Sequence, residues 1–91
     1  MSHTVREKSK LLARVRRIQG QTAALGRALE AEKGCGEILH QIAAIRGAIN
    51  GLMTEVIEDH VQFHVADPTL GERERRDGAA ELIDVIRTYV K

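Results

Sequence analysis

The chain has 91 residues, a formal net charge of +1, and only one Phe, one Tyr and no Trp. A chain of this length makes a single domain, residues 1–91, with a thin core. So few large side chains favour a helical bundle completed by self-association over a compact globule. No apolar run is long enough to cross a membrane, no signal-peptide pattern begins the chain, and a single cysteine excludes an internal disulfide. We therefore expect a cytoplasmic protein.

Basic side chains are concentrated near the N-terminus. Residues 1–29 contain seven basic side chains and one acidic side chain, a net charge of +6, whereas the rest contain seven basic and twelve acidic, a net charge of −5. An oligomer would multiply the positive field, for which nucleic acid is the natural partner. A solvated basic face is the better explanation if the asymmetry stands alone.

A first helix is predicted over residues 5–31, with Thr4 and Glu7 spaced as a capping box at its start. Its apolar positions recur at steps of four and three, as in a helix packed on other helices. They are Leu11, Val15, Ile18, Thr22, Leu25 and Leu29. A second row, the basic stripe, lies about 100° away and is expected to face outward. The stripe comprises Arg6, Lys10, Arg14, Arg17 and Gln21.

A second helix is predicted over residues 35–65, after a tight connection in which Gly34 and Gly36 end the first helix. The two helices would form an antiparallel hairpin. The apolar positions of the second helix are Ile38, Ile42, Ile45, Ile49, Leu52 and Val56. Gly47 and Gly51 lie inside this helix, where glycine costs about 1 kcal/mol relative to alanine. We expect another helix to approach closely there, or a well-packed bundle to tolerate them.

Residues 66–78 are predicted to be a linker, because they contain Pro68, two glycines and a run of charged side chains. A short third helix with one apolar face follows from residue 79. No internal repeat and no strand pattern is present. The predicted fold is all-α, with a three-helix protomer whose long hairpin dimerises into a four-helix bundle.

Candidate metal ligands occur at both ends of the second helix. Cys35 stands at its start, where the helix dipole favours a thiolate, and His60 and His64 share one face near its end. At about 1.5 Å of rise per residue, Cys35 and His60 lie roughly 37 Å apart, whereas metal–ligand bonds are about 2–2.3 Å. An antiparallel partner would bring its Cys35 to the histidines, and the hairpin would bring His3 to them. The predicted site therefore combines His3, His60 and His64 of one subunit with Cys35 of the other.

Each candidate also has a structural explanation. A lone cysteine is more often a small buried hydrophobe, His60 and His64 could be a surface pair, and His40 has no partner and is interpreted as structural. The joint placement of the candidates at mutually reachable ends favours metal binding. One thiolate with several imidazoles suits Ni(II), Co(II) or Zn(II), and the lack of a second cysteine disfavours Cu(I). A Ser2 amine, exposed by removal of Met1, would add a donor and favour Ni(II) or Co(II) over tetrahedral Zn(II).

The motifs RVRRIQGQ at residues 14–21 and QIAAIRGAINGLMTEVIEDH at residues 41–60 resemble the CsoR/RcnR family of metal-responsive repressors, and the likeness spans nearly the whole chain. The ligand set resembles that of its nickel/cobalt branch. The resemblance implies a helical dimer that assembles into a tetramer as a dimer of dimers. It also implies binding to operator DNA without metal and release by Ni(II) or Co(II), which switches on an efflux gene. The DNA-facing positions implied by the family are Lys10, Arg14, Arg17 and Arg46.

Two other functions remain open. In the first, the Ser2 amine and the Cys35 thiolate react with formaldehyde, so that the protein senses an aldehyde. In the second, the chain is a metal-storing or scaffolding bundle with no role on DNA. An enzyme is not expected, because the sequence contains no phosphate loop or nucleophile motif and helical packing predicts no deep cleft.

Overall fold

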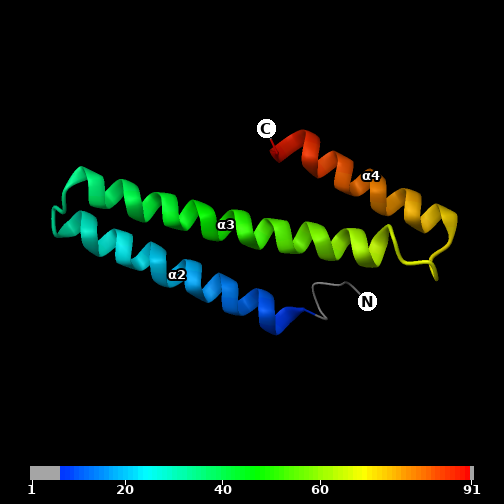
Figure 1. The fold of residues 1–91 in the computed structure, drawn as a ribbon, viewed down its shortest axis with the longest axis horizontal. Coiled ribbons are helices and arrows are strands. Elements are labelled where there is room, and N and C mark those ends of the chain that lie inside the picture. Colours follow the sequence, from blue (N-terminus) through cyan, green and yellow to red (C-terminus); the bar gives the residue numbers. More distant parts are fainter. Residues whose placement is uncertain (1–6, 91) are drawn as a thin grey trace.

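A computed structural model describes residues 7–90. It contains three helices, α2 (Lys8–Glu30), α3 (Cys35–His64) and α4 (Glu72–Tyr89), and no strand within those residues (Figure 1). The prediction of an all-α, three-helix protomer is therefore confirmed. The second helix matches its predicted bounds to within one residue. The first begins at Lys8 rather than at residue 5, since Glu7 lies in a turn; the Thr4 cap lies outside the described residues.

The connection between α2 and α3 ends α2 without glycine. Glu32 adopts the left-handed conformation, with φ of 55°. The Glu32 N–H donates to the Leu29 carbonyl at 3.1 Å, and the Lys33 N–H donates to the Ala28 carbonyl at 3.0 Å. This is a Schellman-type stop, in which glycine usually holds the left-handed position. The prediction that glycine ends the first helix is wrong, because Gly34 is instead the extended residue that precedes α3.

The last helix is longer than predicted. Residues 72–78 are helical, so the prediction of a linker through residue 78 is wrong for them. The acidic side chains Glu72 and Glu74 lie in the first turn, where the helix dipole favours negative charge. A Glu74 side-chain oxygen accepts from the Gly71 N–H at 3.3 Å, and Arg76 pairs with Glu72 one turn earlier at 3.0 Å.

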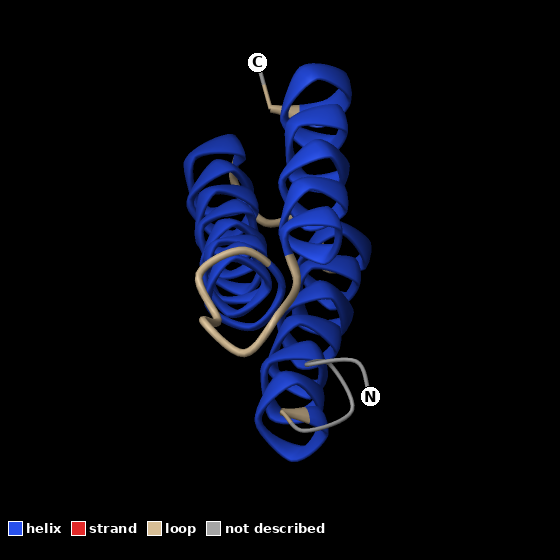
Figure 2. Cartoon of the chain, turned by 90° about the vertical axis from the view of Figure 1, so that its right-hand side faces the viewer, coloured by secondary structure: helices blue, strands red, loops and turns tan. Residues whose placement is uncertain are grey.

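Both α2 and α4 pack on α3, along different parts of its length (Figures 1 and 2). Where α4 meets the end of α3, Gly78 is buried. A Cβ atom at this position would lie 2.2 Å from the carbonyl oxygen of His64, a distance that no side chain can occupy. Gly78 therefore allows the two backbones to approach, and this approach holds α4 against the histidine end of α3.

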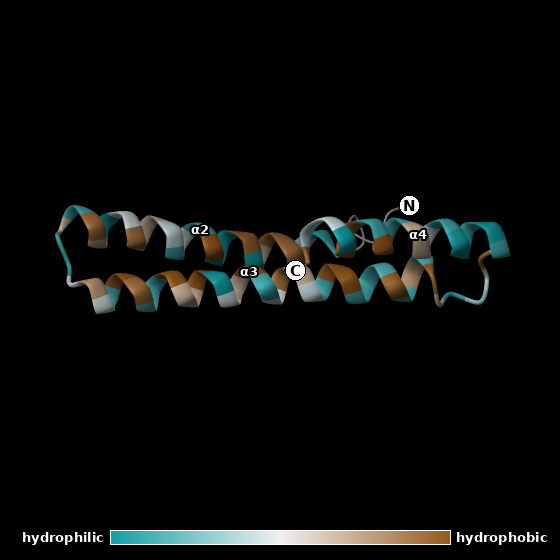
Figure 3. Cartoon of the chain, turned by 90° about the horizontal axis from the view of Figure 1, so that it is seen from above, coloured by the Kyte–Doolittle hydropathy of each residue, from teal (hydrophilic) through white to brown (hydrophobic). Residues whose placement is uncertain are grey.

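The protomer is one flat layer of helices, with principal extents of 56 × 28 × 13 Å. Apolar residues recur along each helix (Figure 3), yet among the described residues Ala28, at 6% exposed, is the only buried apolar one. Ile42 and Ile49, in the apolar row of α3, are 45% and 46% exposed. Stable domains usually bury such rows between two layers. No helix within residues 7–90 combines the length and apolarity of a membrane span.

Replacing Gly78 with alanine should loosen α4. The added methyl group would collide with the His64 carbonyl, so we expect a loss of roughly 1–3 kcal/mol in unfolding free energy. Thermal unfolding followed by circular dichroism measures it. Gly26→Ala is the matched control, because nothing lies within 4 Å of its Cβ position and alanine is the better helix former. A Gly78→Ala midpoint equal to that of the wild type would contradict this packing.

Candidate metal centre and nucleic-acid interface

His60 and His64 lie side by side near the C-terminal end of α3. Their four-residue spacing places both on one helix face, and their ring centroids are 4.9 Å apart with planes tilted by 40°. Both residues are half-buried, where α4 folds back over α3. Two imidazoles at this separation are suited to share one metal ion after small rotations of their rings.

A backbone carbonyl of α4 orients His60. Its Nε2 atom lies 2.8 Å from the Gly78 carbonyl oxygen. Because a carbonyl only accepts, Nε2 must carry the hydrogen, and in a neutral ring Nδ1 is then the unprotonated nitrogen. Metal-binding histidines are commonly held by such a second-nitrogen bond. The sequence does not predict this contact, because its pattern places residue 78 in a linker rather than in a helix packed on α3.

The other candidate ligands are not beside this pair. Cys35 is exposed at the first position of α3, at the hairpin end of the molecule (Figure 1). Within residues 7–90 of one protomer, no three His, Cys, Asp or Glu side chains gather in a manner that could hold a metal ion. His3 and Ser2 lie outside the described residues. One protomer therefore brings together His60 and His64 but not Cys35, as the spacing along one helix requires.

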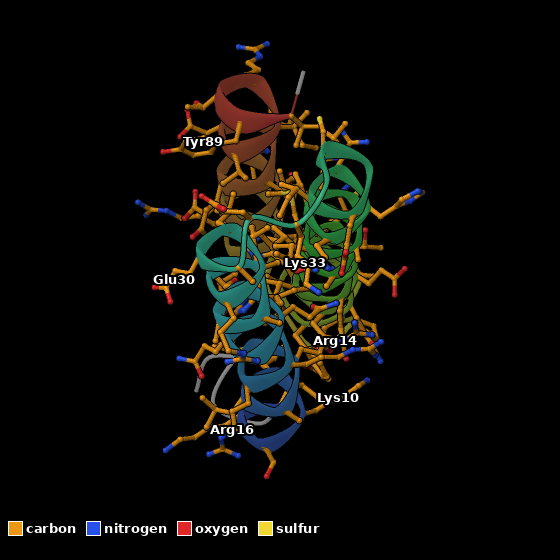
Figure 4. The ribbon with its side chains drawn as sticks, turned by 90° about the vertical axis from the view of Figure 1, so that its left-hand side faces the viewer. Lys10, Arg14, Arg16, Glu30, Lys33 and Tyr89 are labelled. Carbon is orange, nitrogen blue, oxygen red and sulfur yellow. The ribbon has the colours of Figure 1, made fainter. Side chains whose placement is uncertain are left out.

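Lys10, Arg14 and Arg17 of the basic stripe are exposed, as predicted, while Arg6 lies outside the described residues. The contact of two of these side chains with α3 is not predicted from the sequence. Lys10 and Arg14 project toward α3, whereas Arg16 points from another side of α2 (Figure 4). Lys10 and Arg14 form ion pairs with Glu55 of α3. Lys10 Nζ lies 2.5 Å from Oε1 of Glu55, and Arg14 Nε pairs with its Oε2. Glu55 is 8% exposed and is the only buried charged residue among those described.

These ion pairs shift the pKa values of Glu55 and Lys10 so that the charged form of each side chain is favoured. The pKa of Glu55 is lowered from its ordinary value of 4.5, chiefly because Lys10 donates a hydrogen bond to it, and the charge of Arg14 adds to this effect against the opposing effect of burial. The pKa of Lys10 is raised from 10.5, mainly by the same bond to Glu55 and by its charge. The cluster is therefore ionised throughout the neutral range.

Two arginines of the stripe open onto a groove between α2 and α3. The groove has a volume of about 580 Å³, and its α3 side is made of the small residues Ala44, Gly47 and Ala48. Arg14 and Arg17 border it from α2. Arg46 is exposed on α3. Guanidinium groups beside an open groove can bind the oxygens of a phosphate.

Two glycines of α3 do not serve the predicted close approach of helices within the protomer. Nothing lies within 4 Å of a Cβ at Gly47, whereas one at Gly51 would lie 3.2 Å from Nη1 of Arg14. Gly51 therefore leaves room for the Arg14 guanidinium. The sequence suggested that something approaches this face, but not that it is an arginine of the neighbouring helix.

Replacing Glu55 with Gln should weaken the hairpin at neutral pH and not in acid. Because the pKa of Glu55 is lowered in the folded state, its stabilising contribution is present above 4.5 and is lost as the pH falls through the lower folded value. The contribution of Lys10, whose pKa is raised, is lost only as the pH rises above 10.5, so it does not confuse the acid side. Urea unfolding at pH values on both sides of 4.5 measures the difference.

Glu58→Gln is the control for this measurement. Glu58 lies one turn away on α3, is exposed, and forms no ion pair with the described residues. A Glu55→Gln protein as stable as the Glu58→Gln protein at neutral pH would show that the ion pairs do not stabilise the hairpin.

Comparison with known proteins adds independent information. Residues 7–88 match the family model described as metal-sensitive transcriptional repressor. The chain is 52% identical over 91 residues to an uncharacterised protein encoded in the bioA 5′ region of Serratia marcescens, and 46% identical to the transcriptional repressor RcnR of Citrobacter koseri, with full coverage of each chain. The transcriptional repressor RcnR of Salmonella typhimurium is 45% identical, again over both full lengths.

A solved structure has the same fold. It is a glutamate-to-histidine variant of the formaldehyde-responsive regulator FrmR from Salmonella enterica serovar Typhimurium, with a TM-score of 0.85 and 44% sequence identity. The match covers 98% of this chain and 100% of that one. The family model and these full-length relatives agree with the resemblance drawn from the two sequence motifs. The chain belongs to the CsoR/RcnR family of metal-sensitive transcriptional repressors.

Proposed function

We propose that the protein represses transcription by binding operator DNA when metal-free, and that Ni(II) or Co(II) releases it and switches on a metal-efflux gene. The observation that carries this proposal is the arrangement of α3, with His60 and His64 paired at one end and Cys35 exposed at the other. The relatives named RcnR are transcriptional repressors. The protein would act in the cytoplasm as a regulator rather than an enzyme.

The metal centre would be shared between two subunits. In an antiparallel dimer, Cys35 of the partner subunit reaches His60 and His64, and His3 completes the set with the Ser2 amine as a further possible donor. The exposed apolar row on α3 supports a second layer of helices, as in a four-helix bundle. A homotetramer would then form from two such dimers.

The donor set fits a borderline metal ion. Imidazole nitrogens with one thiolate suit Ni(II), Co(II) and also Zn(II). When bound, the ion would act as a cross-link rather than a catalyst. Within the protomer, the Gly78 carbonyl presets the tautomer of His60 with Nδ1 as the metal-binding nitrogen.

The DNA surface would be formed by Lys10, Arg14 and Arg17 of α2 with Arg46 of α3. DNA binding would not require the protein to insert a recognition helix into a groove of the duplex. Phosphate contacts and the shape of the duplex can supply much of the binding. Metal would draw the histidine end of α3 toward Cys35 of the partner subunit and tilt α2, which changes the spacing of the basic side chains. A coupling of about 1–3 kcal/mol between the two sites would be typical.

The second candidate function is formaldehyde sensing. The supporting observation is the full-length structural match to a variant of a formaldehyde-responsive regulator. Here the Ser2 amine and the Cys35 thiolate would be joined by a methylene group from formaldehyde, with loss of water. Mass spectrometry of the formaldehyde-treated protein separates this function from metal sensing.

Replacing Cys35 with alanine should abolish the response to metal while DNA binding survives. The measurement is a binding titration on duplex DNA from upstream of the gene that encodes the chain, with Ni(II), Co(II), Zn(II), Cu(I) and formaldehyde added in turn. We expect Ni(II) or Co(II) to release the wild type. His40→Ala, which changes an exposed histidine in the middle of α3, should respond as the wild type does.

Three results of that titration would contradict the proposal. Loss of DNA binding together with the metal response would show that Cys35 has no separate sensing role. Release by formaldehyde alone would favour the aldehyde sensor. No shift of any duplex would favour a metal-binding bundle without a role on DNA.

Replacing Arg14 with alanine should weaken DNA binding and flatten its salt dependence. Each phosphate contact contributes about 0.9 to the magnitude of the slope of log affinity against log salt concentration. The magnitude of the slope should therefore fall by about 0.9 for each Arg14 side chain that contacts a phosphate. Arg16→Ala is the matched control, since Arg16 is also exposed on α2 but projects from another side (Figure 4). Equal slopes for both variants would rule out the stripe as the interface.

A further inference from the structure

The buried carboxylate of Glu55 has no place in the proposed function so far. The side chain of Glu55 is 9% exposed, whereas those of its partners Lys10 and Arg14 are 63% and 45% exposed. The carboxylate is therefore fixed inside the hairpin, and the two cations reach it from the rim. Such an anion beneath a cationic surface can act in two ways. It can compete with the phosphates of DNA for the two cations, or it can hold the cations in position for DNA.

The atoms of the two ion pairs decide between these roles. Each carboxylate oxygen has its own cation: Lys10 at Oε1 and Arg14 at Oε2. Arg14 makes its contact through Nε, which leaves the outer N–H bonds of Nη1 and Nη2, at the end of the guanidinium, outside that bond. Nη1 lies above Gly51, where the lack of a side chain leaves room for it.

Arg14 also borders the groove that contains Arg17. An arginine gripped by Nε presents its two remaining nitrogens as a rigid fork, which matches two oxygens of a phosphate. A side chain that is already ordered loses less conformational entropy when it binds.

We propose that Glu55 is a positioning residue for DNA: by holding Arg14 through Nε and Lys10 through Nζ, it fixes the Arg14 guanidinium at the edge of the groove, where a backbone phosphate of the duplex binds. This inference rests on the proposed DNA-binding function. It assigns the partner group as a phosphate and gives α3 a part in DNA recognition through a residue that does not itself touch DNA.

The test compares Glu55→Gln with Glu58→Gln in the metal-free protein, on the upstream duplex and on a GC-rich duplex of unrelated sequence. Both substitutions remove one negative charge from the same stretch of α3. If the carboxylates act only by repulsion, both variants bind DNA as tightly as the wild type or more tightly. If Glu55 positions Arg14, Glu55→Gln weakens binding to the upstream duplex by roughly tenfold or more, whereas Glu58→Gln does not weaken it.

A double-mutant cycle separates positioning from a general loss of structure. In an Arg14→Ala background, Glu55→Gln should cost little further affinity, because the fork that it positions is gone. A structural defect would persist in that background. Glu55→Asp, which keeps the charge and shortens the side chain, should weaken DNA binding as Glu55→Gln does. It replaces Glu55→Gln in the cycle if circular dichroism shows that the Glu55→Gln protein has lost helix.

Failure of this inference is distinct from failure of the proposed function. A wild-type protein that shifts no duplex would sink the DNA-binding role itself. A wild type that binds, with Arg14→Ala weakened but Glu55→Gln equal to Glu58→Gln, would overturn only the positioning role of Glu55.

Discussion

The rigid length of α3 constrains every other feature of this protein. A helix of 30 residues holds its two ends apart by about 1.5 Å for each residue, so its first side chain and its last cannot meet within one subunit. The proposed site that joins Cys35 to the histidine pair His60 and His64 therefore needs a second copy of the chain to complete it. The same helix carries Glu55, which pairs with Lys10 and Arg14 of α2, so α3 connects the histidine end to the cations of the proposed DNA surface.

The last helix, α4, packs against the end of α3 that carries His60 and His64 and fixes the orientation of the His60 ring. Gly78 brings the α4 backbone against His64, and the Gly78 carbonyl accepts a hydrogen bond from His60. One residue thus serves both the packing of α4 and the orientation of the His60 ring, because only glycine permits the approach that brings its carbonyl within reach of the ring. Any movement of α4 relative to α3 would change how His60 presents its second nitrogen.

Periodicity in the sequence was sufficient for the helical hairpin and for the separation of Cys35 from His60. It could not show that Lys10 and Arg14 contact α3, because the rotation of α2 about its axis depends on what it meets. The partner of both side chains is Glu55, a buried glutamate of α3 that lies 25 residues after the end of α2. The start of α4 was missed because Pro, Gly and charged residues are typical of both linkers and helix starts. Glu32 holds a left-handed position that composition assigns to glycine.

The interior of the hairpin explains why its two helices could shift against each other. Between α2 and α3 lie small side chains and two carboxamides, and the oxygens Oε1 of Gln21 and Gln41 are buried without a hydrogen-bond partner among the described residues. No large apolar side chain is buried there, since Ala28 is the only buried apolar residue in the part of the chain that the structure describes. A well-interdigitated core resists sliding, and here the Glu55 ion pairs are the ionic contact between α2 and α3 among the described residues. Because Glu55 ties Lys10 and Arg14 of α2 to α3, a shift of α3 in the proposed metal response would move these cations while the hairpin stays folded.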